Sequence, residues 1–355
     1  MHKVLMKGNE AIALAAIKGG CDAFFGYPIT PQNEVPEYLS KHMKNEGKIF
    51  VQAESEVAAI NMVYGAAGAG ARVLTSSSSP GVALKQEGIS YIAGAELPCV
   101  IINVMRGGPG LGGIQPSQAD YYQITRGGGN GDYHVIAFAP ENLQETVDVV
   151  KGAFEIADYY RNPVMVAVDG LIGQMMESVD FDREIPKREL QKKDWATVGK
   201  GQGGRHVVSS LYLDPAELEQ HNLKLHAKYL KVIENEQRYE FINMDNPDYL
   251  IVAYGTMSRI CRSAIEILAK DNIKVGILRP ISIWPYPEKA FKILPKSIKS
   301  ILVAELSLGQ MIDDVKIADS GKHPIHFFGR VGGMIPEPEE IVQAIKKIQG
   351  GENHV

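Results

Sequence analysis

The alternation of short apolar runs with helix-like stretches is the feature that most constrains what this chain can fold into. Residues 23–27, 73–75 and 98–105 are apolar runs of the length of a buried strand, and helical patterns separate them. A strand that is covered on both faces is apolar throughout, and parallel strands need a crossover helix between them. The sequence therefore predicts an α/β chain whose parallel sheet carries helices on both faces.

The length and composition predict a globular protein of two domains. The chain has 355 residues, of which 45% are hydrophobic and 22% charged, so it can build a sizeable core. We predict a first domain over residues 1–185, a linker with a helical excursion over residues 186–246, and a second α/β domain over residues 247–355. A net charge of −5 argues against binding to nucleic acid or to an anionic membrane.

Helical patterns fall between the predicted strands. The pattern over residues 56–70 contains few large side chains, which indicates that another backbone packs closely against it. A polar helix over residues 214–240 could lie across a partner or the other domain, or could be a solvated connection. Further helices are predicted over residues 9–18, 32–44, 82–93, 142–160, 258–271 and 338–348.

The three cysteines, Cys21, Cys99 and Cys261, are far apart, and each lies in or beside an apolar segment. Iron–sulfur and structural zinc sites need clustered thiolates such as C-x-x-C, which the sequence lacks. We therefore expect buried reduced thiols and no metal site. The N-terminus lacks the apolar core of a signal peptide, and no run is long enough to span a membrane, so we expect a cytoplasmic protein.

Polar residues follow the first predicted strand. Pro28 and Pro31 bracket Thr30 and force the residues before them out of the helical region. Thr30 is therefore predicted to end the strand and to cap the next helix, with its hydroxyl free to meet an anion at the carboxyl edge of the sheet. A purely capping role fits the same pattern.

Charged residues follow two further predicted strands. Glu56 starts the small-residue helix, where the helix dipole stabilises a carboxylate; Glu54, two residues earlier, competes for the same role. Arg106 leads a glycine-rich loop, from which its guanidinium could bind a carboxylate or phosphate with two hydrogen bonds. Each residue also fits an ordinary structural role, either as a first-turn acid or as a surface arginine.

The glycines at residues 108–113 match the dinucleotide pattern G-x-G-x-x-G. Pro116 stands where the phosphate-binding helix should begin, so this interpretation has little support. The sequence contains none of the motifs G-x-x-x-x-G-K-[ST], G-x-S-x-G and H-E-x-x-H, which removes the common signatures of nucleotide triphosphatases, serine hydrolases and zinc proteases.

Four motifs in this order resemble the alpha-type subunit of the 2-oxoacid:ferredoxin oxidoreductases. They are YPITP at residues 27–31, QAESEVAA at 52–59, TSSSSPG at 75–81 and VMRGGPGLGG at 104–113. The resemblance covers essentially the whole chain. It implies a parallel sheet like the pyrimidine-binding domain of thiamin diphosphate enzymes, followed by an α/β domain like the C-terminal domain of transketolase. It also implies oxidative decarboxylation of a 2-oxoacid to acyl-CoA.

The resemblance assigns roles to individual residues. Glu56 corresponds to the glutamate that hydrogen-bonds the aminopyrimidine ring of the cofactor, and this correspondence favours it over Glu54. Thr30 and Arg106 match the residues that hold the substrate carboxylate. The same motifs imply a cofactor-binding wall that includes Tyr27, Pro28, Ile29, Ser78 and Ser79.

Two expected motifs are absent from this chain. It has no Gly-Asp-Gly followed by Asn, the pattern that binds Mg²⁺ and the diphosphate, and it has no cysteine cluster. By resemblance, Mg²⁺ and the Fe–S clusters belong to partner subunits: a beta-type subunit with the diphosphate domain, and gamma and ferredoxin-like delta subunits. Coenzyme A and ferredoxin complete the implied set. This chain would then be half of an active site.

The sequence that follows Arg106 bears on the substrate. The run at residues 110–113 looks more like the branched-chain (3-methyl-2-oxobutanoate) type than the 2-oxoglutarate type, and a 2-oxoglutarate or pyruvate enzyme is the alternative. Two other classes stay open. A self-sufficient oxidoreductase would bind NAD at residues 108–113, and a scaffolding subunit would carry no essential site residue.

Overall fold

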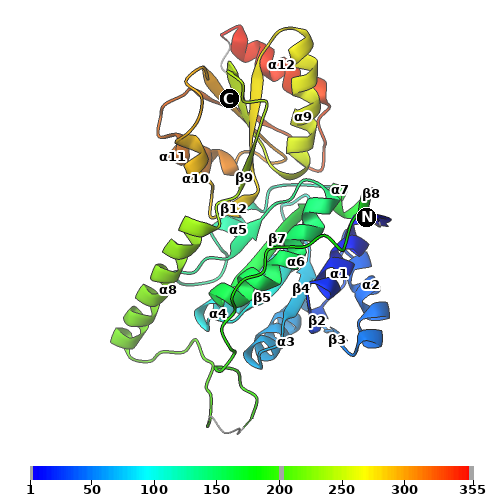
Figure 1. The fold of residues 1–355 in the computed structure, drawn as a ribbon, viewed down its shortest axis with the longest axis vertical. Coiled ribbons are helices and arrows are strands. Elements are labelled where there is room, and N and C mark those ends of the chain that lie inside the picture. The colour runs from blue at the N-terminus through cyan, green and yellow to red at the C-terminus, as the bar shows by residue number, and fades with distance from the viewer. Residues whose placement is uncertain (1–2, 200–203, 352–355) are drawn as a thin grey trace.

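The computed structural model describes residues 3–199 and 204–351, which form two α/β bodies stacked along the long axis of the molecule (Figure 1). Residues 1–2 of the predicted first domain and residues 352–355 of the predicted second domain lie outside the described ranges. Within the described ranges, no helix is both long and apolar enough to cross a lipid bilayer.

The first body is built on a sheet of seven strands in the order β12-β6-β7-β5-β4-β2-β3, and the pairings between its first six strands in the chain are parallel. The predicted parallel sheet is therefore confirmed. Its strands are β2 (Ala23–Gly26), β3 (Ile49–Gln52), β4 (Val73–Ser77), β5 (Cys99–Met105), β6 (Ile136–Phe138), β7 (Pro163–Asp169) and β12 (Ser282–Trp284). A separate antiparallel pair joins β1 (Val4–Lys7) to β8 (Met176–Val179).

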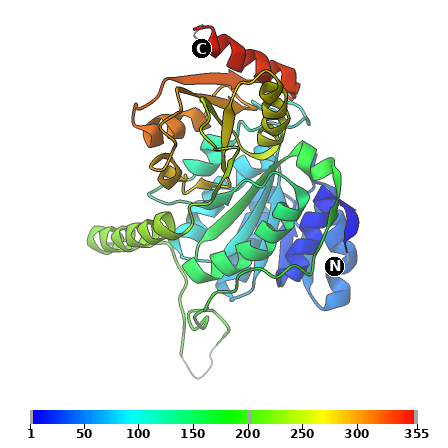
Figure 2. The same cartoon turned by 45° about the horizontal axis from the view of Figure 1, so that its top comes forward.

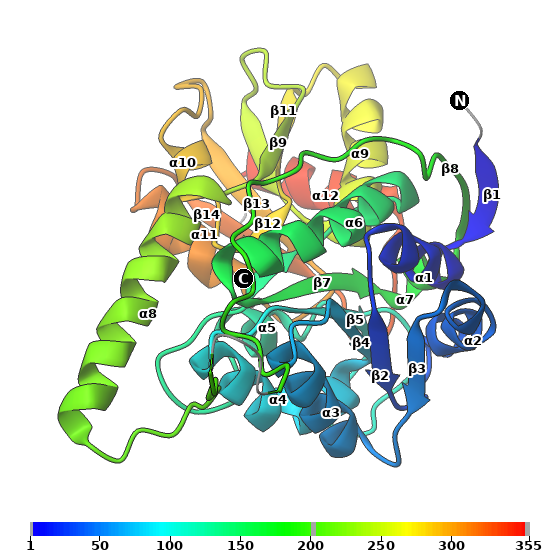
Figure 3. The ribbon, with the colours of Figure 1, turned by 60° about the horizontal axis from the view of Figure 1, so that its bottom comes forward.

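Helices cover both faces of this sheet, with α1 and α6 on one face and α3 and α4 on the other (Figure 3). This arrangement explains why every residue of β5 and β7 is buried and why both strands are largely apolar. The helices are α1 (Gly8–Lys18), α2 (Glu34–His42), α3 (Glu56–Gly68), α4 (Ser79–Gly94), α5 (Tyr121–Thr125), α6 (Leu143–Tyr160) and α7 (Gly170–Gln174), with a 3₁₀ turn η1 (Lys44–Glu46).

The second body is a five-stranded sheet in the order β14-β13-β10-β11-β9, in which only β9 runs antiparallel to its neighbour. The helices α9 and α12 pack together against it (Figure 1). Its elements are β9 (Tyr239–Ile242), β10 (Tyr249–Val252), α9 (Gly255–Lys270), β11 (Val275–Pro280), α10 (Glu288–Phe291), β13 (Ser300–Glu305), α11 (Met311–Asp319), β14 (Ile325–Gly329) and α12 (Pro338–Gln349).

The helix α8 (Pro215–Asn235) connects the two bodies and extends away from the first one (Figures 1 and 2). Two strands cross the predicted boundaries. β9 lies in the predicted linker but pairs with β11, and β12 lies in the predicted second domain but pairs with β6 of the first sheet. The division at residues 185 and 246 stays a prediction. Each sheet contains one strand from outside the predicted domain to which that sheet belongs.

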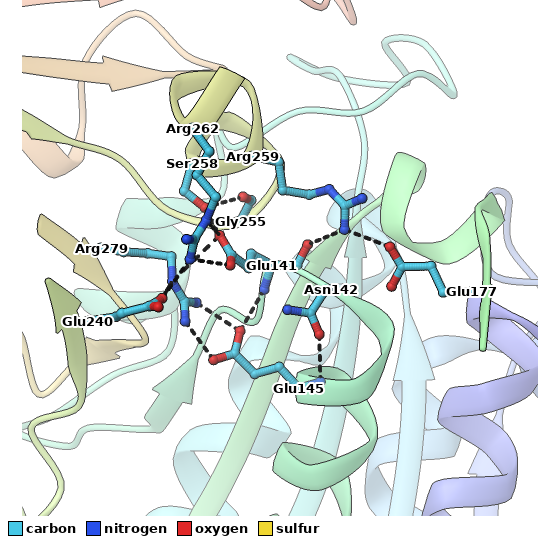
Figure 4. Close-up of polar contacts among 10 residues, drawn as sticks. All are labelled: Glu141, Asn142, Glu145, Glu177, Glu240, Gly255, Ser258, Arg259, Arg262 and Arg279. Atoms are coloured by element: carbon cyan, nitrogen blue, oxygen red, sulfur yellow. Dashed lines mark hydrogen bonds and ion pairs between the residues drawn. The ribbon is translucent and has the colours of Figure 1, made fainter. Parts of the chain in front are cut away.

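A cluster of three arginines and four glutamates joins the two bodies (Figure 4). Arg279 on β11 is 3% exposed, and it donates two hydrogen bonds of 2.8 Å to Glu145 of α6 and one of 2.9 Å to Glu240 of β9. Arg262 of α9 bonds Glu141 at 2.6 Å, and Glu141 also accepts a hydrogen bond from a serine of α9 at 2.6 Å. Arg259 bonds Glu177 of β8 at 2.8 Å. This arginine–glutamate cluster fixes how the bodies sit relative to each other.

Two predicted helix starts are wrong. The helix predicted at residues 32–44 begins at Glu34 with Asn33 at its N-cap, so Thr30 is not the cap. The helix predicted at residues 82–93 begins earlier, at Ser79, because Pro80 in its first turn has the backbone angle that a helix start needs.

Two other ends of predicted helices are also wrong. The helix predicted over residues 214–240 ends at Asn235, since pairing of β9 with β11 overrides local helical preference. The helix predicted over residues 258–271 begins earlier, at Gly255, as the first turn of α9.

Candidate active site

The carboxyl ends of β2, β3, β4 and β5 meet at one edge of the large sheet, because these strands are parallel. The predicted site residues follow these ends. Gly26 ends β2 shortly before Thr30, Ser77 ends β4, and Arg106 comes directly after β5. This edge is where open α/β sheets bind ligands.

Glu56 lies in the first turn of α3 and is 7% exposed. Ser55 caps this helix by accepting a hydrogen bond of 3.1 Å from the Ala58 amide. The Glu56 carboxylate faces the first turn of α4: a methyl group added at Gly81 would lie 2.8 Å from Glu56 Oε1 and 2.2 Å from Ser77 Oγ. Glu54 is exposed before the helix. Of the two glutamates, only Glu56 is therefore enclosed by the sheet edge.

Two serine hydroxyls in the β4–α4 turn are buried without a hydrogen-bond partner in the described part of the chain. They belong to Ser77 and Ser78. Ser78 is the N-cap residue of α4, yet its side chain makes no capping bond. A buried polar group without a partner costs stability, and such groups in native proteins commonly bind a ligand or water. The turn therefore offers two free hydroxyls beside Glu56.

Arg106 is held at the second side of this turn. Ser79 Oγ accepts a hydrogen bond of 3.0 Å from the Arg106 amide and donates one of 3.2 Å to its carbonyl. The guanidinium donates to the carbonyl oxygens of Thr30 at 2.8 Å and Leu111 at 3.2 Å, while its buried Nε has no partner among the described residues. Neutral carbonyl partners leave the positive charge available for an anion.

An acid lies near this arginine. Burial raises the pKa of Asp120, while hydrogen bonds from Ser79 and Asn103 and the charge of Arg106 act in the opposite direction. Asn103 Nδ2 lies 2.9 Å from Asp120 Oδ2. The pair of Asn103 and Asp120 therefore adds a polar contact to Ser79 and Arg106.

The structure brings Thr30 and Arg106 together through the Thr30 backbone carbonyl, and the Thr30 residue is exposed. Tyr27 and Pro28 are also exposed at the end of β2, and Ile29 is half-buried. This strip is thus an open wall of the site rather than a closed pocket.

The glycine-rich loop after β5 begins no helix. Arg106 forms an isolated bridge with Pro116, and the Gly107 amide donates to the Gln115 carbonyl at 2.9 Å. Gly112 has a φ of +54°, and a methyl group there would lie 1.8 Å from the Gly107 oxygen, so the tight loop needs glycine. The next helix, α5, starts only at Tyr121. A dinucleotide site, which uses a helix N-terminus directly after these glycines, is not built here.

Sequence reasoning did not assign a role to several residues of this region. A side chain at Gly81 would meet both Ser77 and Glu56, and Lys85 is fully buried one turn after Gly81. Gln118 bridges the two bodies by bonding the Tyr254 carbonyl and the Leu306 amide. Lys85 carried a usable signal, because it stands in helical register with the apolar residues of α4 that face the sheet.

The cysteines are buried, as predicted. Burial raises the pKa of Cys21 and of Cys99 to about 12 and also raises that of Cys261, so these thiols stay protonated at neutral pH. The described ranges 3–199 and 204–351 contain no group of three or more histidine, cysteine or acidic side chains arranged to hold a metal ion.

Comparison with known protein families identifies the class of protein to which this chain belongs. Residues 14–240 match the family described as pyruvate flavodoxin/ferredoxin oxidoreductase, thiamine diphosphate-binding. Residues 247–341 match pyruvate:ferredoxin oxidoreductase core domain II. The chain therefore belongs to the 2-oxoacid:ferredoxin oxidoreductase family, which confirms the resemblance of the four motifs.

Individual relatives extend this result. The chain is 46% identical to the ketoisovalerate oxidoreductase subunit VorB of Methanothermobacter marburgensis, over 99% of this chain and 100% of the relative. It is 34% identical to the 2-oxoglutarate synthase subunit KorA of Methanothermobacter thermautotrophicus, over 98% of this chain and 99% of the relative. Both relatives are subunits by name.

Two solved structures share the fold. A 2-oxoglutarate:ferredoxin oxidoreductase from Magnetococcus marinus, solved with 2-oxoglutarate, coenzyme A and succinyl-CoA bound, superposes with a TM-score of 0.88 at 27% identity. The match covers 97% of this chain, which spans only 65% of the length of that one. A split-gene transketolase matches with a TM-score of 0.62 at 15% identity over 96% of this chain, which shows the fold alone. The thiamin diphosphate-type fold with a transketolase-like second domain is therefore confirmed.

The residues at the sheet edge fit one end of thiamin diphosphate. An aminopyrimidine ring presents nitrogen donors and acceptors, and the enclosed Glu56 carboxylate and the two unpartnered hydroxyls of Ser77 and Ser78 are complementary to them. Gly81 leaves the space in front of Glu56 free of a side chain.

Proposed function

We propose that this chain is the pyrimidine-binding subunit of a branched-chain 2-oxoacid:ferredoxin oxidoreductase. The complex converts 3-methyl-2-oxobutanoate and coenzyme A to the acyl-CoA and CO₂ and passes two electrons to ferredoxin. The observation that carries this proposal is that an enclosed Glu56 and the Arg106–Thr30 contact lie at one edge of the large sheet. The higher identity to the ketoisovalerate subunit, 46% against 34% for the 2-oxoglutarate subunit, supports the branched-chain substrate.

In this proposal Glu56 orients the cofactor ring. Its carboxylate accepts a hydrogen bond from the ring, and the hydroxyls of Ser77 and Ser78 satisfy further ring atoms. When bound, thiamin diphosphate supplies the electron sink for breaking the bond between the carboxylate and carbonyl carbons of a 2-oxoacid. Tyr27, Pro28 and Ile29 form the outer side of the cofactor wall, and Ser79 holds Arg106 in place.

Arg106 and Thr30 hold the substrate carboxylate. Hydrogen bonds from its two Nη atoms to backbone carbonyls fix the guanidinium plane of Arg106, so binding an oxoacid costs little side-chain ordering. The exposed Thr30 hydroxyl lies on the same strip. Fixing the carboxylate directs the reacting carbonyl toward the cofactor.

The loop at residues 107–115 favours an aliphatic substrate. It contains no ionisable side chain, so it offers no partner for the second carboxylate of 2-oxoglutarate. Its two large apolar side chains, Leu111 and Ile114, are 84% and 56% exposed. A branched aliphatic chain held by Arg106 can pack on these side chains.

We also propose the partners. A beta-type subunit supplies the Mg²⁺ and diphosphate site, and gamma and ferredoxin-like delta subunits carry Fe–S clusters and deliver electrons to ferredoxin. The open wall formed by Tyr27, Pro28 and Thr30 supports a shared site, since these residues are exposed in the isolated chain. Three free, buried cysteines support a cytoplasmic location for the complex.

The test is reconstitution. Co-expressed with subunits of the predicted types, the chain should support reduction of ferredoxin or a viologen dye that depends on both 3-methyl-2-oxobutanoate and coenzyme A. Glu56→Ala should abolish this turnover while circular dichroism and subunit assembly stay unchanged. Full turnover in that variant would remove Glu56 from the mechanism.

Rates with 2-oxoglutarate and pyruvate, measured on the same complex, test the substrate. A higher kcat/KM for either would replace the branched-chain assignment. Turnover that survives replacement of Glu56, Thr30 and Arg106 together would identify a scaffolding subunit instead.

A further inference from the structure

Lys85 is a fully buried lysine beside the proposed cofactor site. It lies on α4, one turn after Gly81, and its side chain is 0% exposed. Its ammonium donates hydrogen bonds to Thr75 Oγ1 at 2.7 Å and to the Ser76 carbonyl at 3.1 Å, both on β4. Both partners are neutral, so these two hydrogen bonds do not neutralise the ammonium, and lysine is rarely buried without a charged partner.

Glu56 is the acid whose negative charge acts on Lys85. Two groups can influence the charge of Lys85 electrostatically: Glu56 on α3 and Cys99 on β5. The Cys99 thiol stays protonated because burial raises its pKa to about 12. Burial lowers the pKa of Lys85 to about 7, and the negative charge of Glu56 opposes that change. The charge on Lys85 therefore depends on the carboxylate that the proposed function places on the cofactor ring.

The local geometry links the two groups. Gly81 and Lys85 are four residues apart on α4 and hence on one face of the helix, and the Gly81 position abuts Glu56 Oε1. Ser76, whose carbonyl accepts a hydrogen bond from Lys85, donates its own hydroxyl to Gln32 Oε1 at 2.6 Å. Gln32 follows Thr30 by two residues. The lysine is thus connected through Ser76 to the segment that follows Thr30.

We propose that Lys85 is a positioning residue that supplies buried positive charge to the Glu56 carboxylate and so fixes it for hydrogen bonding to the cofactor ring. This inference rests on the proposed function, because it assumes that Glu56 contacts thiamin diphosphate. Lys85 itself touches neither the cofactor nor the substrate. Removing its charge should weaken cofactor binding only where Glu56 retains its own charge.

A thermodynamic cycle tests this dependence. The dissociation constant of thiamin diphosphate with Mg²⁺ is measured by calorimetry on the assembled, cofactor-depleted complex. Lys85→Met, which keeps the length and removes the charge, should weaken binding about tenfold or more in the Glu56 protein. In a Glu56→Gln background, the same change should have an effect of less than about twofold.

Lys151→Met is the matched control. Lys151 is also buried, but its ammonium bonds the carbonyls of Phe181 and Arg183, away from the site. Its replacement should leave the dissociation constant unchanged. Equal weakening by Lys151→Met and Lys85→Met would mean that loss of a buried charge acts through general stability, which would overturn the inference.

The pH profile gives a second readout. Cofactor binding by the native complex should weaken as pH rises from about 6 to 8, because Lys85 loses its proton in this range. Thr75→Val removes a hydrogen bond to the ammonium and should move the midpoint to lower pH, and this variant serves if Lys85→Met fails to fold. A profile that is unchanged in Thr75→Val would overturn the inference.

Two outcomes distinguish a failure of the proposed function from a failure of the inference about Lys85. If Glu56→Gln binds cofactor and turns over like the native complex, the proposed function of Glu56 is wrong and the inference falls with it. If Glu56→Gln loses turnover but Lys85→Met binds cofactor with native affinity, only the inference about Lys85 is wrong.

Discussion

Arg106 Nη1 lies 2.8 Å from the backbone carbonyl oxygen of Thr30, a residue 76 positions earlier in the chain. This hydrogen bond ties the loop after β2 to the loop after β5, across the end of β4. It explains how two short motifs far apart in sequence meet at one edge of the sheet, where we propose that they bind the substrate carboxylate. The arginine is fixed by neutral carbonyls, so the contact orients its charge without neutralising it.

Replacing Arg106 with lysine should weaken oxoacid binding. A lysine ammonium cannot reach the carbonyls of Thr30 and Leu111 and present two parallel donors to a carboxylate at the same time. We expect KM for 3-methyl-2-oxobutanoate to rise about 10- to 100-fold, with an unchanged KM for coenzyme A. Steady-state kinetics on the assembled complex measures both. Arg183→Lys at an exposed ion pair is the control, and equal kinetics in both variants would contradict the role of Arg106.

Gly81→Ala should close the space in front of Glu56. The added methyl group would lie 2.2 Å from Ser77 Oγ and 2.8 Å from Glu56 Oε1, so cofactor binding should be lost and the chain destabilised by about 1–3 kcal/mol. Gly65→Ala on α3 meets nothing within 4 Å and should stabilise the isolated chain by about 0.5–1 kcal/mol. Chemical denaturation and calorimetry report the two effects. Native cofactor affinity in Gly81→Ala would mean that the ring binds elsewhere.

Substitution of Leu111 by lysine should change substrate preference. A cation on the loop at residues 107–115 supplies the missing partner for the second carboxylate of 2-oxoglutarate and removes an apolar surface for a branched chain. The ratio of kcat/KM for 2-oxoglutarate to that for 3-methyl-2-oxobutanoate should rise about tenfold. Leu213→Lys, at a comparably exposed leucine outside the loop, is the control. An unchanged ratio would show that substrate choice is made on another chain.

Arg279→Met should destabilise the joint between the two bodies. The variant leaves the buried Glu141 and the half-buried Glu145 and Glu240 without their central cation, at a cost of about 3–5 kcal/mol. Lys346→Met breaks an exposed ion pair with Asp271 and should change stability by less than about 1 kcal/mol. Urea unfolding of the isolated chain compares them. Similar midpoints for both variants would mean that the arginine–glutamate cluster contributes no net stability.

The stability of the isolated chain should also depend on Lys85 and pH. The folded-state pKa of about 7 is below the ordinary 10.5, so the unfolded chain binds more protons between these values and the Lys85 contribution to stability rises with pH. The slope reaches about 1.4 kcal/mol per pH unit. Lys85→Met should lose this slope, and the difference between the two proteins removes the similar contribution of Lys228. Parallel stability curves would show that Lys85 does not titrate there.

The sequence predicted the parallel sheet and the edge at which its polar residues meet, since β5 and β7 are almost entirely apolar and such runs are a local property of the sequence. It also placed Glu56 in the first turn of a helix, which the structure confirms. These features depend on residues that are close in sequence.

The sequence could not show features that arise from distant contacts. Thr30 was expected to cap a helix, but its carbonyl instead accepts a hydrogen bond from Arg106, and Asn33 takes the N-cap position. β9 continues a helical pattern and becomes a strand only because β11 lies beside it. The burial of Lys85 against Thr75 likewise depends on how α4 packs on the sheet. Such outcomes are set by tertiary packing, which a local pattern does not record.

The crossing of β9 and β12 between the two bodies has a consequence for synthesis on the ribosome. When residue 240 has just emerged, the large sheet lacks the edge strand Ser282–Trp284, and the strand at Tyr239–Ile242 lacks its partner. The nascent chain therefore holds two unpaired strand edges until residues near 284 leave the exit tunnel, and such edges attract other chains. A release of the chain between these points would yield a fragment prone to aggregation rather than a free-standing first half.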